Sequence, residues 1–483
     1  MDRDRMAGVL VGQACGDALG VPYEFGSRAL GEHPTMLGGG LGAYAPGEFS
    51  DDTQMAVCIA QVAATGADLT SDAALDEVAT AFLEWQRLGA TDIGNQTARV
   101  LGAALRTEGP VGRRMTEAAR RDLAVHPRGG AGNGALMRTA VVGLTRLDDR
   151  RLTADAAAAV AALTHPDPDA VASCVLWSEA VRRAVVDREL DVHSGLDLLP
   201  VGQRDRWRAL LDEATQEQPS RFLRNGWTVT ALQAAWSSIV HTPVPAEEPA
   251  AGSFGCLHLQ HVLETAIRIG HDTDTVAAIA GGLLGAYWGV SAVPARWRRK
   301  VHGWPGVRVR DLVTLSVLTG VGGRPDSAGW PGVARMPYAE PGWTAVPHPD
   351  DAGVLLGTVG DLGQAGDAVV SLCRLGFHQV PAAGVREEDH VEVWLLDSDD
   401  PADNPHLDFV LADTASVVAD LRAEGRTVLV HCVAAEQRTP AVAVAYARRL
   451  GRSAQEAQAA VAQALPSTRS SGRLWERAAS VSL

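Results

Sequence analysis

The sequence predicts a multidomain protein in which an all-α domain is followed by a small α/β domain. The chain has 483 residues, which is longer than the roughly 250 to 300 residues that one hydrophobic core usually serves. Apolar residues recur at helical spacing through the first two thirds of the chain, whereas strand-like and helical patterns alternate in the last third. We therefore expect an all-α domain over residues 1–320, a linker over 321–350 and an α/β domain over 351–483.

Helical periodicity in the first domain is plain in stretches such as DEVATAFLEWQRL and DAVASCVLWSEAVRRAVV. Residues 276–293 carry no charge and approach the length of a membrane span, but Ala and Gly dominate them and two aspartates precede them. We interpret this run as a buried central helix. No association with a membrane is expected.

Pro and Gly interrupt the predicted linker throughout, as in GGRPDSAGWPGVARMPYAEPGW. Its tryptophans, Trp330 and Trp343, indicate that it packs against other residues, because tryptophan is rarely left exposed in a flexible tether. Beyond it, GVLLGTV, HVEVWLLD and RTVLVHC are typical of short strands and alternate with helical segments. This alternation favours a largely parallel sheet.

The composition of the chain excludes some classes of function. The formal net charge of −15 argues against a general affinity for nucleic acid, which depends on Lys and Arg. Six widely spaced cysteines predict reduced thiols and no disulfide framework. The first twenty residues do not read as a signal peptide, so we expect a cytoplasmic protein.

Two acidic helix starts, FSDDTQM and GHDTDT, lie far apart in the sequence, each directly before a run of small apolar residues. Asp, Ser and Thr are favoured N-cap residues, so each motif alone is consistent with a simple cap. Each carries more carboxylate than a cap needs, however. Oxygen ligands of this kind suit Mg²⁺, whereas zinc prefers Cys and His, which residues 50–52 and 272–275 lack. Together they suggest the two halves of a metal site.

Six motifs occur in one order along the first domain: GVLVGQACGDALGVPYEF, SDDTQM, TDIGNQT, GAGNGALMR, THPDP and GHDTDT. In this order they resemble ADP-ribosyl-glycohydrolases of the dinitrogen-reductase-activating type. The resemblance implies a hydrolase that cleaves the glycosidic bond between ADP-ribose and an acceptor, with two Mg²⁺ or Mn²⁺ ions at the floor of the cleft. The implied metal ligands are Ser50, Asp51, Asp52, Asp272, Asp274 and Thr275.

The same resemblance assigns further roles. Glu24 would ligate an ion or activate water, and Asp92 would orient the attacking water; their alternatives are a surface carboxylate and a helix N-cap. His271 stands where many members have Gly, and Thr273 would point away from the ions. The implied residues for binding ADP-ribose are Asn95, Gly132, Asn133, Gly134 and His165. For His165 the alternative is completing a helix end.

A second motif, TVLVHCVAAEQRTPAVAVAYARR, sets Cys432 and Arg438 in the loop between a predicted strand and a predicted helix. A helix N-terminus stabilises a thiolate and cradles phosphate, and Arg can grip two phosphate oxygens. The motif resembles the phosphate loop of dual-specificity and tyrosine phosphatases. This implies a phosphorylated substrate and a phosphocysteine on Cys432, with Thr439 easing its release and Asp397 as general acid.

The general acid has alternatives in Asp399 and Asp400. Ala435 stands where these phosphatases usually carry Gly, and a positive φ there costs a non-glycine residue roughly 1 to 2 kcal/mol. A phosphate-binding module without catalysis is therefore an alternative for this domain. For the whole chain, the alternatives to the hydrolase are a non-hydrolytic ADP-ribose reader and a phosphatase whose N-terminal domain is a targeting scaffold.

Overall fold

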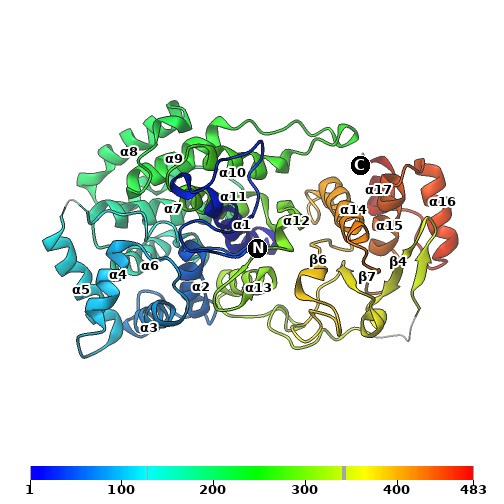
Figure 1. The fold of residues 1–483 in the computed structure, drawn as a ribbon, viewed down its shortest axis with the longest axis horizontal. Helices are drawn as coiled ribbons and strands as arrows, with labels where there is room; N and C mark the ends of the chain where they lie inside the picture. Colours follow the sequence, from blue (N-terminus) through cyan, green and yellow to red (C-terminus); the bar gives the residue numbers. More distant parts are fainter. Residues whose placement is uncertain (1, 128, 340–343, 482–483) are drawn as a thin grey trace. The chain divides into compact units, whose positions relative to one another are not determined.

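The computed structural model describes residues 2–127, 129–339 and 344–481, which divide into two compact units. The first unit comprises Met1–Pro243, His258–Val293 and Lys300–Arg324. The second comprises Val244–Leu257, Pro294–Arg299 and Pro325–Leu483, so two short segments from within the predicted first domain belong to it. Figure 1 shows the helices of the first unit and the sheet of the second.

The first unit is helical, as its periodicity predicted. Its helices are α1 (Arg3–Gly20), α2 (Asp51–Ala63), α3 (Asp72–Leu88), α4 (Asn95–Ala104), α5 (Val111–Val125), α6 (Arg150–Ala162), α7 (Pro168–Asp187), α8 (Val201–Gln216), α9 (Thr228–His241), α10 (His258–Arg268), α11 (Thr273–Trp288) and α13 (Val309–Gly320). The all-α prediction did not foresee β1 (His302–Gly303) and β2 (Val307–Arg308), which pair antiparallel as a ladder of two residues per strand.

Helices α1 and α11 lie side by side in the first unit (Figure 1). Glycines recur at every fourth residue of α1 and therefore share one side of the helix. A Cβ at Gly8 would lie 2.1 Å from the carbonyl oxygen of Gly285, and one at Gly12 would lie 2.3 Å from that of Gly281. Glycine is required here because only it lets the two backbones approach so closely.

The apolar run before residue 293 forms most of α11, which is buried from Thr273 to Ala286, so the predicted buried helix is confirmed. Within the described parts of the chain, no helix has both the length and the apolar character that crossing a membrane requires.

The second unit is built on a sheet with the strand order β3–β4–β7–β5–β6. Strand β3 pairs antiparallel with β4, and the other pairs are parallel, which confirms the predicted largely parallel sheet. The strands are β3 (Val346–His348), β4 (Asp351–Thr358), β5 (Ala368–Ser371), β6 (His390–Glu392) and β7 (Val428–Cys432). The helices are α12 (Ala295–Arg298), α14 (Leu407–Ala423), α15 (Arg438–Arg449), α16 (Ala454–Ala464) and α17 (Arg473–Ser480).

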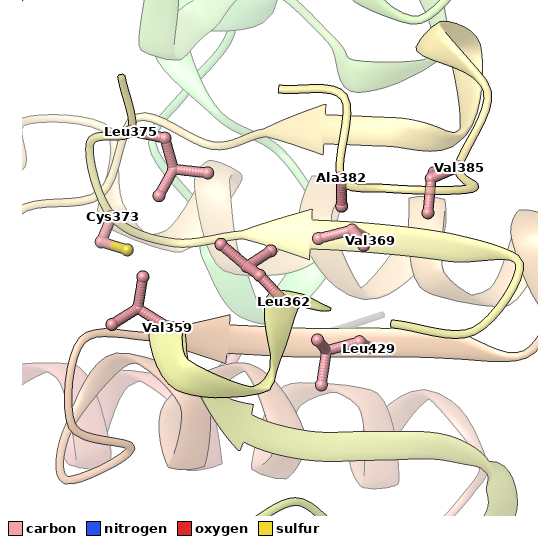
Figure 2. Packing of buried hydrophobic residues seen from close by; sticks show 8 residues of the cluster. All are labelled: Val359, Leu362, Val369, Cys373, Leu375, Ala382, Val385 and Leu429. Atoms are coloured by element: carbon pink, nitrogen blue, oxygen red, sulfur yellow. The ribbon is translucent and has the colours of Figure 1, made fainter. Parts of the chain in front are cut away.

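One apolar cluster packs against this sheet. Figure 2 shows Val369 of β5 and Leu429 of β7 with Val359 and Leu362, which follow β4. Cys373 belongs to the same cluster and is 6% exposed. The cluster therefore supports the segments that leave β4 and β5, next to the end of β7 where Cys432 lies.

The predicted linker is not a separate element. Residues 325–339 belong to the second unit, and Trp330 packs edge to face on Trp394 with ring centroids 5.8 Å apart. The guanidinium of Arg374 lies 4.4 Å from the Trp330 ring centroid. Trp343 lies outside the described residues. Pro and Gly indicate where regular elements are interrupted, but they carry no information on which residues the segment contacts.

Candidate active site

Two groups of carboxylates converge in the first unit. Asp17, Asp52 and Asp274 form one group, and Glu24, Asp272 and Asp274 form the other. Within each group, one carboxylate oxygen from each residue lies within 4.8 Å of the others. Asp274 belongs to both groups, so the two are contiguous. Each has the oxygen donors and the spacing to hold a hard divalent cation.

The close contact of α1 with α11 brings Asp17 to Asp274. A Cβ on Gly16 would lie 2.2 Å from the carbonyl oxygen of Ala277, and one on Gly20 would lie 2.4 Å from the Cα of Asp274. Asp17 lies between these two contacts along α1. Its carboxylate therefore reaches the start of α11 only because the backbones touch.

Asp17 also joins α1 to the start of α2. It accepts hydrogen bonds from the Ser50 N–H at 2.8 Å, the Thr53 N–H at 3.0 Å and the Thr53 hydroxyl at 2.6 Å. The Ser50 hydroxyl donates to Asp52 Oδ2 at 2.9 Å. The other oxygen, Asp52 Oδ1, is buried and has no hydrogen-bond partner among the described residues. The site thus contains an acceptor oxygen that the described residues leave unsatisfied.

Removal from water raises the pKa of these carboxyls. Burial raises the pKa of Asp17 to about 6. It raises the pKa values of Asp51, Asp52 and Asp274 well above their usual range, and neighbouring carboxylates raise them further. Ionising all of these groups together is unfavourable without a compensating positive charge.

Two asparagines hold Asp272. Its N–H donates to Asn225 Oδ1 at 3.1 Å, and Asn133 Nδ2 donates to Asp272 Oδ2 at 2.7 Å. The Thr273 hydroxyl donates to the carbonyl of Gly20 at 2.9 Å. Burial raises the pKa of Asp272, whereas hydrogen bonds from the side chains of Asn133 and then Thr275 lower it.

Glu24 lies in the short 3₁₀ helix η1 (Val21–Gly26) and is 8% exposed. Burial first, and then the charges of Asp272, Asp92 and Asp51, raise its pKa to about 8. Asp92 thus lies close enough for its charge to act on this cluster, and its Oδ1 accepts the N–H of Ile93 at 2.7 Å. Asp92 is not the N-cap of α4, because Gly94 occupies that position.

Four of the five residues predicted to bind ADP-ribose, Gly132 to Gly134 and His165, form one group that contacts Asp272 through Asn133. Asn133 contacts Asp272 directly, and Gly132 and Gly134 flank it in the sequence. A Cβ on Gly134 would lie 3.0 Å from the His165 ring. Asn95 is the first residue of α4 and lines a cavity of about 460 Å³ with Gln96, Arg99, Val125, His126, Pro127 and Gly129.

In the second unit, Cys432 ends β7 and Arg438 begins α15. Arg438 Nη1 donates to the carbonyl of Leu372 at 2.7 Å, and its buried Nε has no hydrogen-bond partner among the described residues. Ala435 has a φ of 53°, so the loop does impose the left-handed conformation at this position. The Thr439 hydroxyl is buried and donates to the carbonyl of Gly357 at 3.4 Å.

The three candidate acids differ in their contacts. Asp397 Oδ2 lies 3.4 Å from Arg438 Nη2. Asp399 pairs with Arg469 and accepts the N–H of Arg473 at the start of α17, so it has a structural role. Asp400 accepts the N–H of Ala402 within a local turn. Of the three, Asp397 is the one in contact with Arg438.

A sequence model described as ADP-ribosylglycohydrolase matches residues 1–324 of the chain. This match spans more than half of the chain and contains every residue of both carboxylate groups. The chain belongs to the ADP-ribosylglycohydrolase family. The predicted resemblance of the first domain, and its helical fold, are thereby confirmed.

Several relatives in this family carry hydrolase names. The chain is 29% identical over 312 residues to the ADP-ribosylarginine hydrolase Tri1 of Pseudomonas putida (strain GB-1), covering 62% of this chain and 74% of that protein. It is 26% identical over 313 residues to the ADP-ribosyl-[dinitrogen reductase] glycohydrolase of Rhodospirillum rubrum, and 28% identical over 343 residues to the human ADP-ribosylhydrolase ARH3. Each of these two matches covers 62% of this chain and 90% of the relative.

A solved structure gives the same result. An ADP-ribosylglycohydrolase-related protein complex superposes with a TM-score of 0.51 at 26% sequence identity, covering 67% of this chain and 99% of that chain. Together with the hydrolase names of the relatives, this supports a glycohydrolase enzyme. The family match ends at residue 324, so the phosphatase-like character of residues 351–483 stays a prediction.

The sequence analysis did not single out Asp17, which belongs to a carboxylate group, or Asn225, which accepts the Asp272 N–H. Asp17 stands in the motif GVLVGQACGDALGVPYEF, but the resemblance assigned no role to it. A signal was available, because an aspartate embedded among glycines and alanines of a buried helix needs a partner. Asn225 precedes Gly226, a pair typical of turns, and no local pattern connects it with Asp272.

Proposed function

We propose that this chain hydrolyses the glycosidic bond between ADP-ribose and an acceptor, and that the reaction requires two Mg²⁺ or Mn²⁺ ions. The observation that carries the proposal is the pair of carboxylate groups that share Asp274. The residues that would hold the ions are Asp17, Glu24, Ser50, Asp51, Asp52, Asp272, Asp274 and Thr275. Asp17 is added to the predicted ligands, and Glu24 would be a ligand or a base.

The donor set fits hard divalent cations. It consists of carboxylate and hydroxyl oxygens, and neither group includes a His or Cys. Asp52 Oδ1 has no hydrogen-bond partner among the described residues, and burial together with mutual repulsion raises the pKa values of Asp52 and Asp274. Divalent cations would satisfy the free oxygen and offset the repulsion.

Each residue of the site would have a separate role in hydrolysis. Bound divalent ions would hold ribose hydroxyls and lower the pKa of a coordinated water. Glu24 would accept the proton of the water whose oxygen attacks C1″, while the bond to the acceptor breaks and the acceptor leaves with the electron pair. Asp92 would orient that water, and Asn133 holds Asp272 in place. The carboxylates would stabilise positive charge on the ribose ring.

The rival is a reader that binds ADP-ribose without cleaving it. The position of Glu24 within a carboxylate group favours hydrolysis, because binding alone needs no proton acceptor there. Glu24→Gln keeps the shape of the side chain and is expected to bind ADP-ribosylated protein while losing at least about 100-fold in the rate of ADP-ribose release. Equal release by variant and wild type would contradict the role of Glu24, and retention without release by the wild type would identify a reader.

For the second unit we propose a site for a phosphate monoester at the loop from Cys432 to Arg438. Arg438 at the start of α15 supports it, because its buried Nε has no partner among the described residues and such a guanidinium donor is costly to leave unpaired. Arg438 also pairs with the carboxylate of Asp397, so a bound phosphate would compete with that carboxylate for the guanidinium or reposition it.

The test is hydrolysis of an aryl phosphate by the full chain. We expect turnover that Cys432→Ser abolishes, while inorganic phosphate still binds to the variant. Binding without turnover in the wild type would support the non-catalytic phosphate-binding module. Absence of both would refute the proposal.

A further inference from the structure

Two buried side chains face the bare side of the loop from Gly132 to Gly134. A Cβ built on Gly132 would lie 3.6 Å from His165 Nε2 and 3.7 Å from Gln96 Oε1. A Cβ built on Gly134 would lie 3.2 Å from the same His165 nitrogen. Gln96 is 7% exposed and His165 is 2% exposed. A nitrogen and an oxygen from separate segments therefore converge where the loop has no side chain.

The orientation of the Gln96 amide follows from its contacts. Its Nε2 donates to the carbonyl of Gly130 at 3.2 Å and to that of Thr164 at 3.1 Å. If the amide were turned over, its oxygen would face these two carbonyl oxygens, and none of the three could donate, so this orientation is fixed. Gln96 Oε1 is buried and has no hydrogen-bond partner among the described residues. An unpaired buried acceptor costs about 1 to 3 kcal/mol, which a donor on a ligand would recover.

The protonation of His165 follows in the same way. Arg138 Nη2 donates to the Thr164 hydroxyl oxygen at 2.7 Å, and a guanidinium can only donate. The Thr164 hydroxyl lies 2.8 Å from His165 Nδ1, and among its contacts with the described residues this nitrogen is the one that can accept its hydrogen, so we assign the hydroxyl as the donor. The ring hydrogen is therefore on Nε2. Burial first, and then the charge of Arg138, lower the pKa of His165 to about 3, so the ring stays neutral.

We infer that Gln96 Oε1 and His165 Nε2–H together bind one ribose hydroxyl of the substrate. A hydroxyl can accept from His165 and donate to Gln96 with the same atom, whereas a phosphate oxygen would only accept and would face the Gln96 carbonyl oxygen. The inference rests on the proposed function, because it takes the ligand to be ADP-ribose. Gln96 is a substrate-binding residue in this assignment, and Arg138 and Thr164 are positioning residues that act through His165.

Gly132→Ala tests the site without cutting a hydrogen bond, because the new methyl would make ordinary contacts of 3.6 Å and longer. We expect calorimetry in magnesium buffer to show at least a tenfold rise in the Kd of ADP-ribose, since the methyl occupies the place of the hydroxyl. Gly102→Ala, on the same helix as Gln96, is the matched control and should bind as the wild type does. Unchanged binding by Gly132→Ala would overturn the inference.

Measuring the affinity of Gly132→Ala for ADP as well as for ADP-ribose shows which of the two riboses carries the bound hydroxyl. A loss of affinity for both ADP and ADP-ribose assigns the hydroxyl to the adenosine, whereas a loss for ADP-ribose alone assigns it to the terminal ribose. Replacing the responsible hydroxyl by hydrogen should weaken wild-type binding and make it insensitive to Gly132→Ala. An analogue without that hydroxyl that loses as much affinity as its parent would refute the assignment.

Nitrogen NMR of the His165 ring gives a readout that is independent of turnover. The wild type and Thr164→Ser are expected to show the neutral Nε2–H tautomer from pH 5 to 8. Thr164→Val removes the donor to Nδ1, so it should mix the tautomers and raise the Kd of ADP-ribose severalfold. An Nδ1–H tautomer or a protonated ring in the wild type would contradict the assignment. Failure of hydrolysis alone would leave these binding and NMR results unchanged.

Discussion

Asp274→Asn should make the metal-free protein more stable and the enzyme inactive. Asp274 is 4% exposed and belongs to both carboxylate groups, whose oxygens lie within 4.8 Å of one another. At an effective dielectric constant of about 20, two unit charges at that distance repel by roughly 3 to 4 kcal/mol. Part of this repulsion is already relieved by protonation. We therefore expect the neutral amide to raise the free energy of unfolding without metal by about 1 to 3 kcal/mol.

The assay is urea unfolding of the full chain in EDTA and in excess Mg²⁺. The wild type should gain stability from Mg²⁺ by mass action, and Asp274→Asn should gain little, because it lacks the carboxylate that both groups share. Release of ADP-ribose should fall at least about 100-fold.

Asp4→Asn is the matched control, since Asp4 is a buried carboxyl of α1 outside both groups whose pKa burial raises to about 7. It should keep the full response to Mg²⁺. A less stable metal-free Asp274→Asn protein, or one that responds to Mg²⁺ as the wild type does, would refute the reasoning.

Three further predictions concern the pH, the helix contact and the phosphate loop. Because the pKa of Glu24 is raised to about 8, the metal-free protein loses stability from this group as the pH rises from about 4 to 8. Over the same range the apparent affinity for Mg²⁺ should rise, and binding of Mg²⁺ should release protons. Calorimetry in two buffers of different ionisation enthalpy measures this proton release. Gly12→Ala should lower the free energy of unfolding in urea by about 3 kcal/mol or more, because the new Cβ would lie 2.3 Å from the Gly281 carbonyl oxygen. Gly202→Ala is the control and should not destabilise the chain, because its new Cβ would meet no other part of the described structure within 4 Å. Ala435→Gly should raise the free energy of unfolding of the second unit by about 1 kcal/mol in urea, because it removes the left-handed strain at φ 53°. An unchanged free energy of unfolding would count against that strain.

Local patterns predicted the parts of the site that lie at helix starts. Asp52 and Asp274 were found because each precedes a visible run of small apolar residues. Asp17 was not found, because it lies within a buried helix and its role depends on the contact of α1 with α11. That contact depends on glycines spaced four apart in both helices, a pattern that gains meaning only when the two helices are known to touch.

The second unit shows the same division between local and distant information. Alternating strand and helix patterns predicted a largely parallel sheet. The position of residues 325–339 was missed, because its contacts, such as that of Trp330 with Trp394, join residues far apart in the sequence. Positive φ at Ala435 was anticipated, since a loop of this kind requires it whatever residue is present.

The most direct test of the central claim is release of ADP-ribose from an ADP-ribosylated acceptor while Mg²⁺ is titrated into the EDTA-treated full chain. The acceptors should include arginine-linked and serine-linked ADP-ribose, so that the choice of acceptor does not decide the outcome. The account predicts no release without metal and saturable release that follows occupancy of the two carboxylate groups. Release at the same rate in EDTA would contradict it.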